Sequence, residues 1–485
     1  MMKRHNIIYY SVLLALMLLF AIYTSLRFPY TYMNMEGDDF WALTGDYWQL
    51  KLAMPPALTN WLADYLRQFY RSPYIAAGIE TLVLGAIGFL SHSILEYSNR
   101  KGWEKTVVLW VGLILTVLLG FLCTFNLALM LECFFFCILL LTYLKIPNLW
   151  GRILWSLFCV PVGFMLMQMP ILLSLVVMQI LFDVEDYGKK KLLYSIPTFL
   201  LYSVAPLIYS QQVAFIPYDK LYGFRNFYLI PMTGVYNQNA ERVNKIVSLA
   251  NEERWEDLLY KEHVKRDAQR GNAIVLRYAL LAESALGNLP ENLLDYPINN
   301  ESLFLFQHDR NIVSLQFNRL FYLNLGIYDE AFHQAMEYGL LMTNGINFSS
   351  LRQMVDYSIE EGDWEIADKY LTLLSKSTCH KKFIEERRER LQQVSTLRRD
   401  LEETPLRADN FVGGYPLPIE MLRLTRYYKD SPNRKKMADY AICSYILRGD
   451  VNSFRIAVQA FDYYKDKELP RAYRQFLEST QSSLP

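Results

Sequence analysis

Two apolar runs, TVVLWVGLILTVLLGFLC at residues 106–123 and LALMLECFFFCILLLTYL at residues 127–144, are joined only by Thr124, Phe125 and Asn126. Each run is close to the length of about 20 residues that a helix needs to cross a hydrocarbon core of ~30 Å. The three residues between them suffice for a tight turn. The sequence therefore predicts a transmembrane helical hairpin.

Other apolar runs flank this hairpin and have similar lengths. The stretch from Leu149 to Phe182 is too long for one span, because a helix of that length would measure ~50 Å. We expect it to break at Gln168, Met169 and Pro170. A signal peptide is not expected at the N-terminus, because the first run is long and further spans follow. The seven predicted spans are 7–28, 74–95, 106–123, 127–144, 149–167, 170–182 and 192–212.

Basic residues give an orientation to these spans. Lys3 and Arg4 precede the first run, and Arg100, Arg152 and the lysines at 189–191 fall in connections on the same predicted side. By the positive-inside rule this side, with the N-terminus, is cytoplasmic. Seven spans then place residues 213–485 outside the cytoplasm, whereas six would reverse that placement.

Composition excludes several classes of partner and site. The 485 residues carry 49 basic and 49 acidic side chains, so no global field favours nucleic acid, and no nucleic-acid partner is expected. Six cysteines are present without a C-x-x-C motif, which argues against a zinc or haem site.

Residues 29–73 form the one long loop of the first half, on the predicted outer side. It carries Glu36, Asp38 and Asp39, and then a predicted helix from Ala57 to Phe69 with an aromatic face beside a polar stripe, as suits a membrane surface. The carboxylates could accept a proton from a hydroxyl group or hold a divalent cation through Asp38 and Asp39. The alternative is an ordinary solvated turn.

Two further carboxylates lie inside predicted spans. Glu80 and Glu132 are each about two turns below the outer surface. A carboxylate at such depth is costly and usually faces a wet cavity or a partner. Together with the loop acids they suggest one polar cavity open to the outside. The alternative is that each fixes helix packing by hydrogen bonds.

The layout of residues 1–214 resembles the GT-C class of membrane glycosyltransferases, which begin with one span and a long outer loop with an acidic pair. The resemblance implies transfer of a sugar from a polyprenyl-linked donor. It implies that Asp38 and Asp39, with Glu36 as a substitute, act as catalytic residues on the acceptor or a metal. Seven spans are few for this class.

The same resemblance bears on substrate binding. Glu80 and Glu132 would contact substrate in the predicted cavity. The motif that would bind the donor phosphate is not evident, and Arg67 and Arg71 are the nearest basic residues to the outer surface.

Residues 218–485 are charged and predict helix after helix. GIYDEA at 326–331 and GDWEIA at 362–367 match the turn of a tetratricopeptide (TPR) unit, 36 positions apart. Weaker copies begin at Glu253, Gly287 and Gly449. The predicted fold class is all-α, a seven-span transmembrane bundle (1–214) followed by an extracytoplasmic TPR-like repeat domain (218–485). Stacked repeats cover one another's apolar faces.

The C-terminal tail, with SPNR at 431–434, ADY at 438–440 and Leu469-Pro470, resembles uncharacterised Bacteroidota membrane proteins that couple a multi-pass bundle to helical repeats. This resemblance implies the fold and a Gram-negative inner-membrane location, and no activity.

Two functions follow as hypotheses. The first is a GT-C-like transferase whose repeat domain presents the acceptor. The alternative is a membrane-anchored scaffold that binds an envelope protein partner without catalysis. A transporter is disfavoured, because inverted repeats and midplane charges are lacking.

Overall fold

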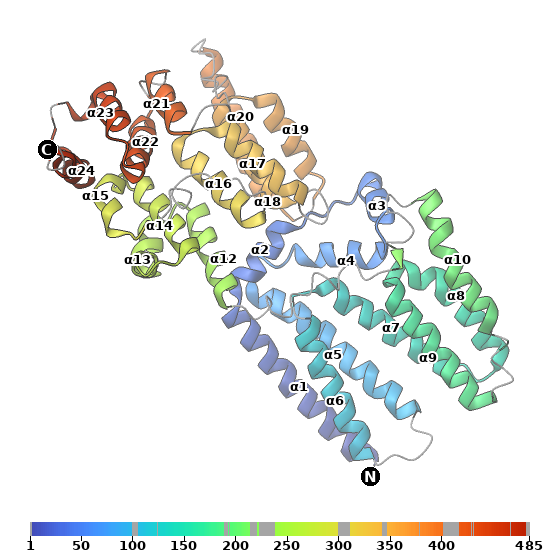
Figure 1. The fold of residues 1–485 in the computed structure, drawn as a ribbon. Helices are drawn as coiled ribbons and strands as arrows, with labels where there is room; N and C mark the ends of the chain where they lie inside the picture. The colour runs from blue at the N-terminus through green and yellow to red at the C-terminus, as the bar shows by residue number, and fades with distance from the viewer. Residues whose placement is uncertain are drawn as a thin grey trace. The chain divides into compact units, whose positions relative to one another are not determined.

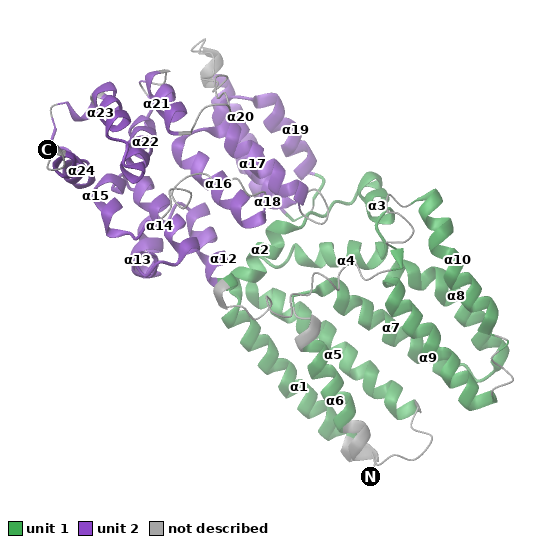
Figure 2. Ribbon diagram, in the orientation of Figure 1, with its two compact units in different colours: residues 1–241, 376–379 green, residues 242–375, 380–485 purple. Residues whose placement is uncertain are grey.

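A computed structural model describes most of the chain, and its regular elements there are all helices. Contacts within the chain divide it into two compact units (Figure 2), Met1–Glu241 with Lys376–Cys379, and Arg242–Ser375 with His380–Pro485. The described residues are 2–98, 105–123, 125–188, 193, 195–213, 221–222, 238–298, 311–341, 347–377, 379–400, 417–427, 429, 431–465 and 467–481.

The first unit is a bundle of long apolar helices with three short helices at one end (Figure 1). Its described helices are α1 (Met2–Arg27), α2 (Pro29–Asp38), α3 (Gly45–Leu52), α4 (Ala57–Arg67), α5 (Pro73–Ser98), α6 (Lys105–Cys123), α7 (Leu127–Lys145), α8 (Leu149–Leu166), α9 (Met169–Tyr187) and α10 (Ile196–Gln212).

Four of the described helices are long and apolar enough to cross a membrane: Asn6–Arg27, Pro73–Tyr97, Leu127–Lys145 and Leu149–Leu166. The chain is therefore membrane-associated. Helices α6, α9 and α10 occupy the other three positions where the sequence predicts spans. Arg100, Lys101 and the lysines at 189–191 lie outside the described residues.

The bundle exposes apolar side chains, as a surface in contact with lipid does. Leu19 on α1 is 64% exposed and Leu82 on α5 is 75% exposed. The interior is closely packed, and Leu172 of α9 lies so near Gly163 of α8 that a Cβ at residue 163 would meet its Cδ1 at 2.5 Å. The two helices are separate because the backbone is extended at Met167 and Gln168.

The segment between α1 and α5 is more ordered than the sequence predicts. Only the helix at 57–69 is expected there, yet α2 and α3 precede it. We call residues 29–72 the lid. It lies at the end of the bundle where α8 ends, because the Thr59 hydroxyl donates to the Leu166 carbonyl at 2.5 Å.

The second unit consists of shorter amphipathic helices (Figure 1). They are α12 (Gln238–Asn251), which begins at the end of the first unit, a π-helical turn (Asp257–Lys261), α13 (Val264–Gln269), α14 (Ala273–Ala285), α15 (Leu289–Asn292), α16 (Ile312–Leu325), α17 (Tyr328–Leu341), α18 (Phe348–Glu361), α19 (Trp364–Leu374), α20 (Lys381–Asp400), α21 (Leu417–Tyr427), α22 (Arg434–Arg448), α23 (Val451–Ala460) and α24 (Arg471–Gln481).

Consecutive helices from α16 to α20 pack on one another. The turns in this stack use glycine in the left-handed conformation, with φ of 75° at Gly326 and 91° at Gly362. Each glycine follows the last residue of one helix, and the next helix starts two residues later. Glycine adopts this conformation without the strain that a Cβ brings. Ala331 and Ala367, five positions after these glycines, are fully buried.

Two of the three weaker repeat copies differ from full helical hairpins, whereas Gly449, with φ of 68°, joins α22 to α23 in the same way as Gly326 joins α16 to α17. Shortly after Glu253 the chain forms a short π-helical turn, and shortly after Gly287 it forms the four-residue α15. Helix α22 packs against α14 and α16 rather than only against its sequence neighbours. Phe321 and Tyr440 make that contact, with ring centroids 5.0 Å apart.

Candidate functional site

The three predicted catalytic acids lie at the end of a helix. Glu36 and Asp38 occupy the last turn of α2, and Asp39 follows directly. Pro29 begins this helix, at a position where a missing backbone N–H costs nothing. All three acids are half-buried. The interpretation of this segment as a solvated turn is therefore wrong.

Asp39 is held by a cation from the same lid. Arg67 Nη1 donates to Asp39 Oδ2 at 2.7 Å, and the side chains are only 17% and 12% exposed. Burial alone would lower the pKa of Arg67, but the neighbouring carboxylates of Asp39 and Asp64 raise it above its usual value. Arg67 therefore stays charged, as a fixed guanidinium at the end of α4.

A second ion pair, which the sequence interpretation did not include, lies deeper in the lid. Lys51 of α3 contacts Asp64 of α4, and both side chains are at most 5% exposed. The Tyr47 hydroxyl is 2.6 Å from Asp64 Oδ2 and 2.7 Å from the Phe40 carbonyl oxygen. Burial raises the pKa of Asp64, and Lys51 opposes that shift. The one feature of the sequence that could have pointed to this ion pair is Lys51, a lone lysine within the otherwise uncharged stretch WQLKLAM.

Helix α4 turns its polar side inward. Asp64 and Gln68 are 3% and 6% exposed, whereas Leu58 and Phe69 are 39% and 38% exposed. Gln68 donates to the Trp41 carbonyl at 3.1 Å. Two residues of the predicted polar stripe, Asp64 and Gln68, thus face protein, whereas Leu58 and Phe69 are exposed. Arg71, the other predicted phosphate-binding residue, is exposed beyond the end of this helix.

The lid carries an apolar pocket of about 410 Å³, within the ~300–1,000 Å³ range of ligand sites. Two tryptophans shape it, with the rings of Trp48 and Trp61 6.2 Å apart. Trp61 also lies 5.4 Å from the ring of Trp41. The pocket is lined by Leu43, Thr44, Gly45, Trp48, Leu58 and Trp61.

Glu80 lies below the lid and is fully buried. It accepts hydrogen bonds from the hydroxyls of Tyr32 at 3.0 Å and Tyr70 at 3.1 Å. Glu132 is also fully buried, on α7. It accepts from the backbone N–H of Gln168 at 2.9 Å and from its side-chain amide at 2.8 Å.

These contacts favour packing roles for both glutamates. Neither is among the residues that line the lid pocket or the pocket described below between α8, α9 and α10, and neither are Glu36, Asp38 and Asp39. The carboxylates of Asp39, Glu80 and Glu132 each have their own partners, so the described structure does not gather them around one pocket.

The profile of a family of unknown function, DUF6057, matches residues 3–480. The chain belongs to the DUF6057 family. Searches of curated proteins and of solved structures found no match.

The described part of this DUF6057 chain contains no group of three or more His, Cys, Asp and Glu residues placed to hold a metal ion. Its lid offers a different set of chemical groups. Arg67 presents a fixed positive charge, held by Asp39. Asp38, which precedes Asp39 in the sequence, is a half-buried carboxylate. The tryptophan-lined pocket offers an apolar surface on the same segment. Such a set suits a ligand with an anionic group and an apolar part.

Proposed function

We propose that this protein transfers a sugar from a polyprenyl-linked donor to an acceptor on the outer side of a bacterial inner membrane. The observation that carries this proposal is the lid. It combines the Asp39–Arg67 pair with an apolar, tryptophan-lined pocket beside the membrane helices. A polyprenyl phosphate sugar has both the anion and the chain that these features suit.

The proposed reaction breaks the bond between sugar C1 and the phosphate oxygen and forms a bond between C1 and the acceptor oxygen. Asp38 takes the proton of the acceptor hydroxyl. The leaving polyprenyl phosphate keeps the electron pair, and Arg67 stabilises its charge. Asp39 acts as a positioning residue, because it fixes the guanidinium at 2.7 Å.

The topology in this proposal has seven spans with a cytoplasmic N-terminus. Helices α6, α9 and α10 have the lengths of short spans, at 19, 19 and 17 residues. The second unit is then a periplasmic, TPR-like domain, which the matched turns at Gly326 and Gly362 support. Protease treatment of spheroplasts should cut a cleavage site inserted after Ser482, and inverted vesicles should protect it; the reverse pattern overturns the topology.

The transfer reaction is tested with the full chain in nanodiscs and a panel of polyprenyl phosphate sugars, followed by mass spectrometry of the lipid. We expect wild type to consume a donor when an acceptor extract is present. Asp38→Asn and Arg67→Gln should lose at least ~100-fold in rate. Asp46→Asn, an exposed acid on the same lid, is the control. Equal rates for Asp38→Asn and the control would refute the role of Asp38.

The scaffold function is the second candidate, and one surface favours it. Met336, Leu340 and Leu341 on α17 are 45%, 61% and 49% exposed. A photocrosslinker at residue 340 should give a discrete adduct with an envelope protein, whereas one at His333, an exposed polar position of the same helix, should not. Adducts of the same pattern from both sites would count against this surface.

A further inference from the structure

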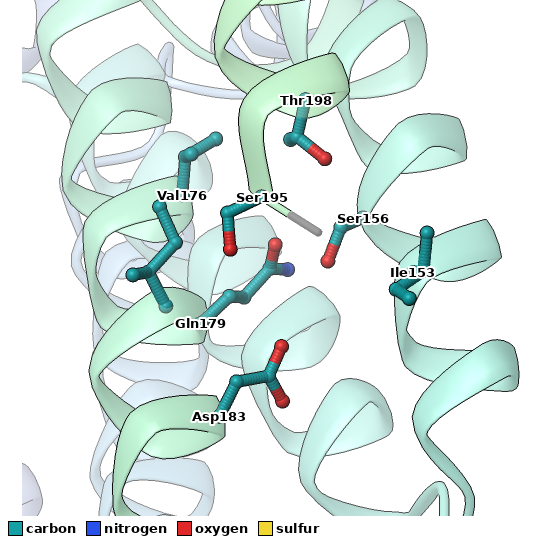
Figure 3. Close-up of a pocket in the computed structure, with 8 residues that line it drawn as sticks. Ile153, Ser156, Val176, Gln179, Asp183, Ser195 and Thr198 are labelled. Carbon is teal, nitrogen blue, oxygen red and sulfur yellow. The ribbon is translucent and has the colours of Figure 1, made fainter. Parts of the chain in front are cut away.

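A polar pocket lies between α8, α9 and α10, away from the lid. Figure 3 shows Ser156, Gln179, Asp183 and Ser195 with their polar atoms toward a common space. Five of its eight lining residues are polar. The lining residues are Ile153, Ser156, Val176, Gln179, Ile180, Asp183, Ser195 and Thr198.

Gln179 is the residue that needs an explanation. It is 1% exposed, and neither its amide nitrogen nor its amide oxygen has a hydrogen-bond partner among the described residues. The thiol of Cys159 is a neighbouring group, and a thiol forms only weak hydrogen bonds. A buried amide without partners costs about 1–3 kcal/mol or more in proteins. A ligand in the pocket would remove this cost.

The pocket is small. Its volume is ≈ 10 Å³, which is about the space that one water molecule occupies by this measure. An organic molecule does not fit. The occupant is therefore a water molecule or a single ion of similar size.

The charges at the pocket favour a cation. Arg152 lies 2.7 Å from Asp186 Oδ2 and 3.3 Å from Asp183 Oδ1. One guanidinium thus faces two carboxylates, and these three groups carry a net charge of −1. The oxygens of Ser156, Gln179 and Thr198, together with those of Asp183 and Ser195, supply hard ligands of the kind that such cations prefer.

The same ligand set favours a monovalent over a divalent ion. Calcium takes six to eight oxygens, often from several carboxylates, and magnesium keeps several waters. Here the single lining carboxylate, Asp183, is already shared with Arg152, and the volume of ≈ 10 Å³ is too small for an ion that keeps several waters. We propose that this pocket binds one monovalent metal cation, of the size of Na⁺, through Gln179, Asp183 and the three hydroxyl groups.

The test uses the full chain in nanodiscs and NaCl, KCl or LiCl as the probe, replaced at constant ionic strength by N-methylglucamine chloride. The unfolding midpoint should rise by about 3–6 °C for each tenfold increase of one of these cations above its dissociation constant. Wild type should also bind close to one cation per chain in equilibrium dialysis.

Thr198→Val keeps the shape of the side chain and removes one ligand, and Gln179→Leu removes another. Both should lose the rise in midpoint and the bound cation, and Thr198→Val keeps the test valid if Gln179→Leu does not fold. Ser203→Ala is the control, because this exposed α10 hydroxyl bonds only to its own helix. If the unfolding midpoint of wild type did not depend on the cation, as for a pocket filled by water, the proposal would be overturned. An equal rise of the unfolding midpoint in Thr198→Val would overturn it as well.

Discussion

Replacing Lys51 by methionine tests how the lid is held together. The substitution leaves Asp64 without its cation at a site where the carboxylate is 5% exposed. Removal of one partner from a buried pair costs about 3–5 kcal/mol, because the other charge stays buried. Opening of α3 and α4 should therefore become about 10²–10⁴-fold more frequent. Hydrogen exchange of the amides in these two helices measures that change.

The double variant Lys51→Met with Asp64→Leu distinguishes the ion pair from simple packing. It removes both charges, and such replacements are often neutral. Tyr47 loses an acceptor but keeps the Phe40 carbonyl oxygen at 2.7 Å. We therefore expect exchange within about tenfold of wild type. Exchange of the double variant as fast as that of Lys51→Met alone would refute the reasoning.

Two predictions concern the second unit. Gly326→Ala should destabilise it by more than the roughly 1–2 kcal/mol that an alanine in the left-handed conformation costs, because the new Cβ would also collide with the side chain of Asn433. Gly287→Ala, with the same φ of 75° and open space, is the control, and equal shifts in urea midpoint would contradict this. Burial raises the pKa of Asp439 above its usual value near 3.8, so the folded chain holds a proton that the unfolded chain releases. The stability from that proton is complete below the unfolded pKa near 3.8 and is lost as pH rises through the folded pKa, so the midpoint of wild type relative to Asp439→Asn should fall as pH rises above about 3.8. A constant difference would contradict this.

The sequence was informative where structure depends on local pattern. The break near Gln168 follows from the length that a span can have, and α8 and α9 separate there. The turns at Gly326 and Gly362 follow from the need for a residue without Cβ. The start of α24 directly after Pro470 has the same local origin, since proline suits the beginning of a helix.

The partners of the acids depend on tertiary contacts that no local pattern specifies. Asp39 and Arg67 are 28 positions apart, and Glu80 and Tyr32 are 48 positions apart. The prediction of an acidic cavity counted carboxylates without the hydroxyl, amide and guanidinium groups that satisfy them. Lys51 was missed for the same reason, because a lysine in a short amphipathic segment is usually exposed.

The contact between Glu132 and Gln168 has a consequence for the order of the first turn of α9. The first amides of a helix have no partner within it, and no side chain within α9 caps its start. Glu132 supplies that acceptor from α7. Because this acceptor comes from a residue 36 positions earlier in the chain, the start of α9 depends on the packing of α7 beside it. Glu132→Asp, which shortens the side chain by one methylene group, should therefore speed hydrogen exchange of the first amides of α9, and unchanged exchange would contradict this.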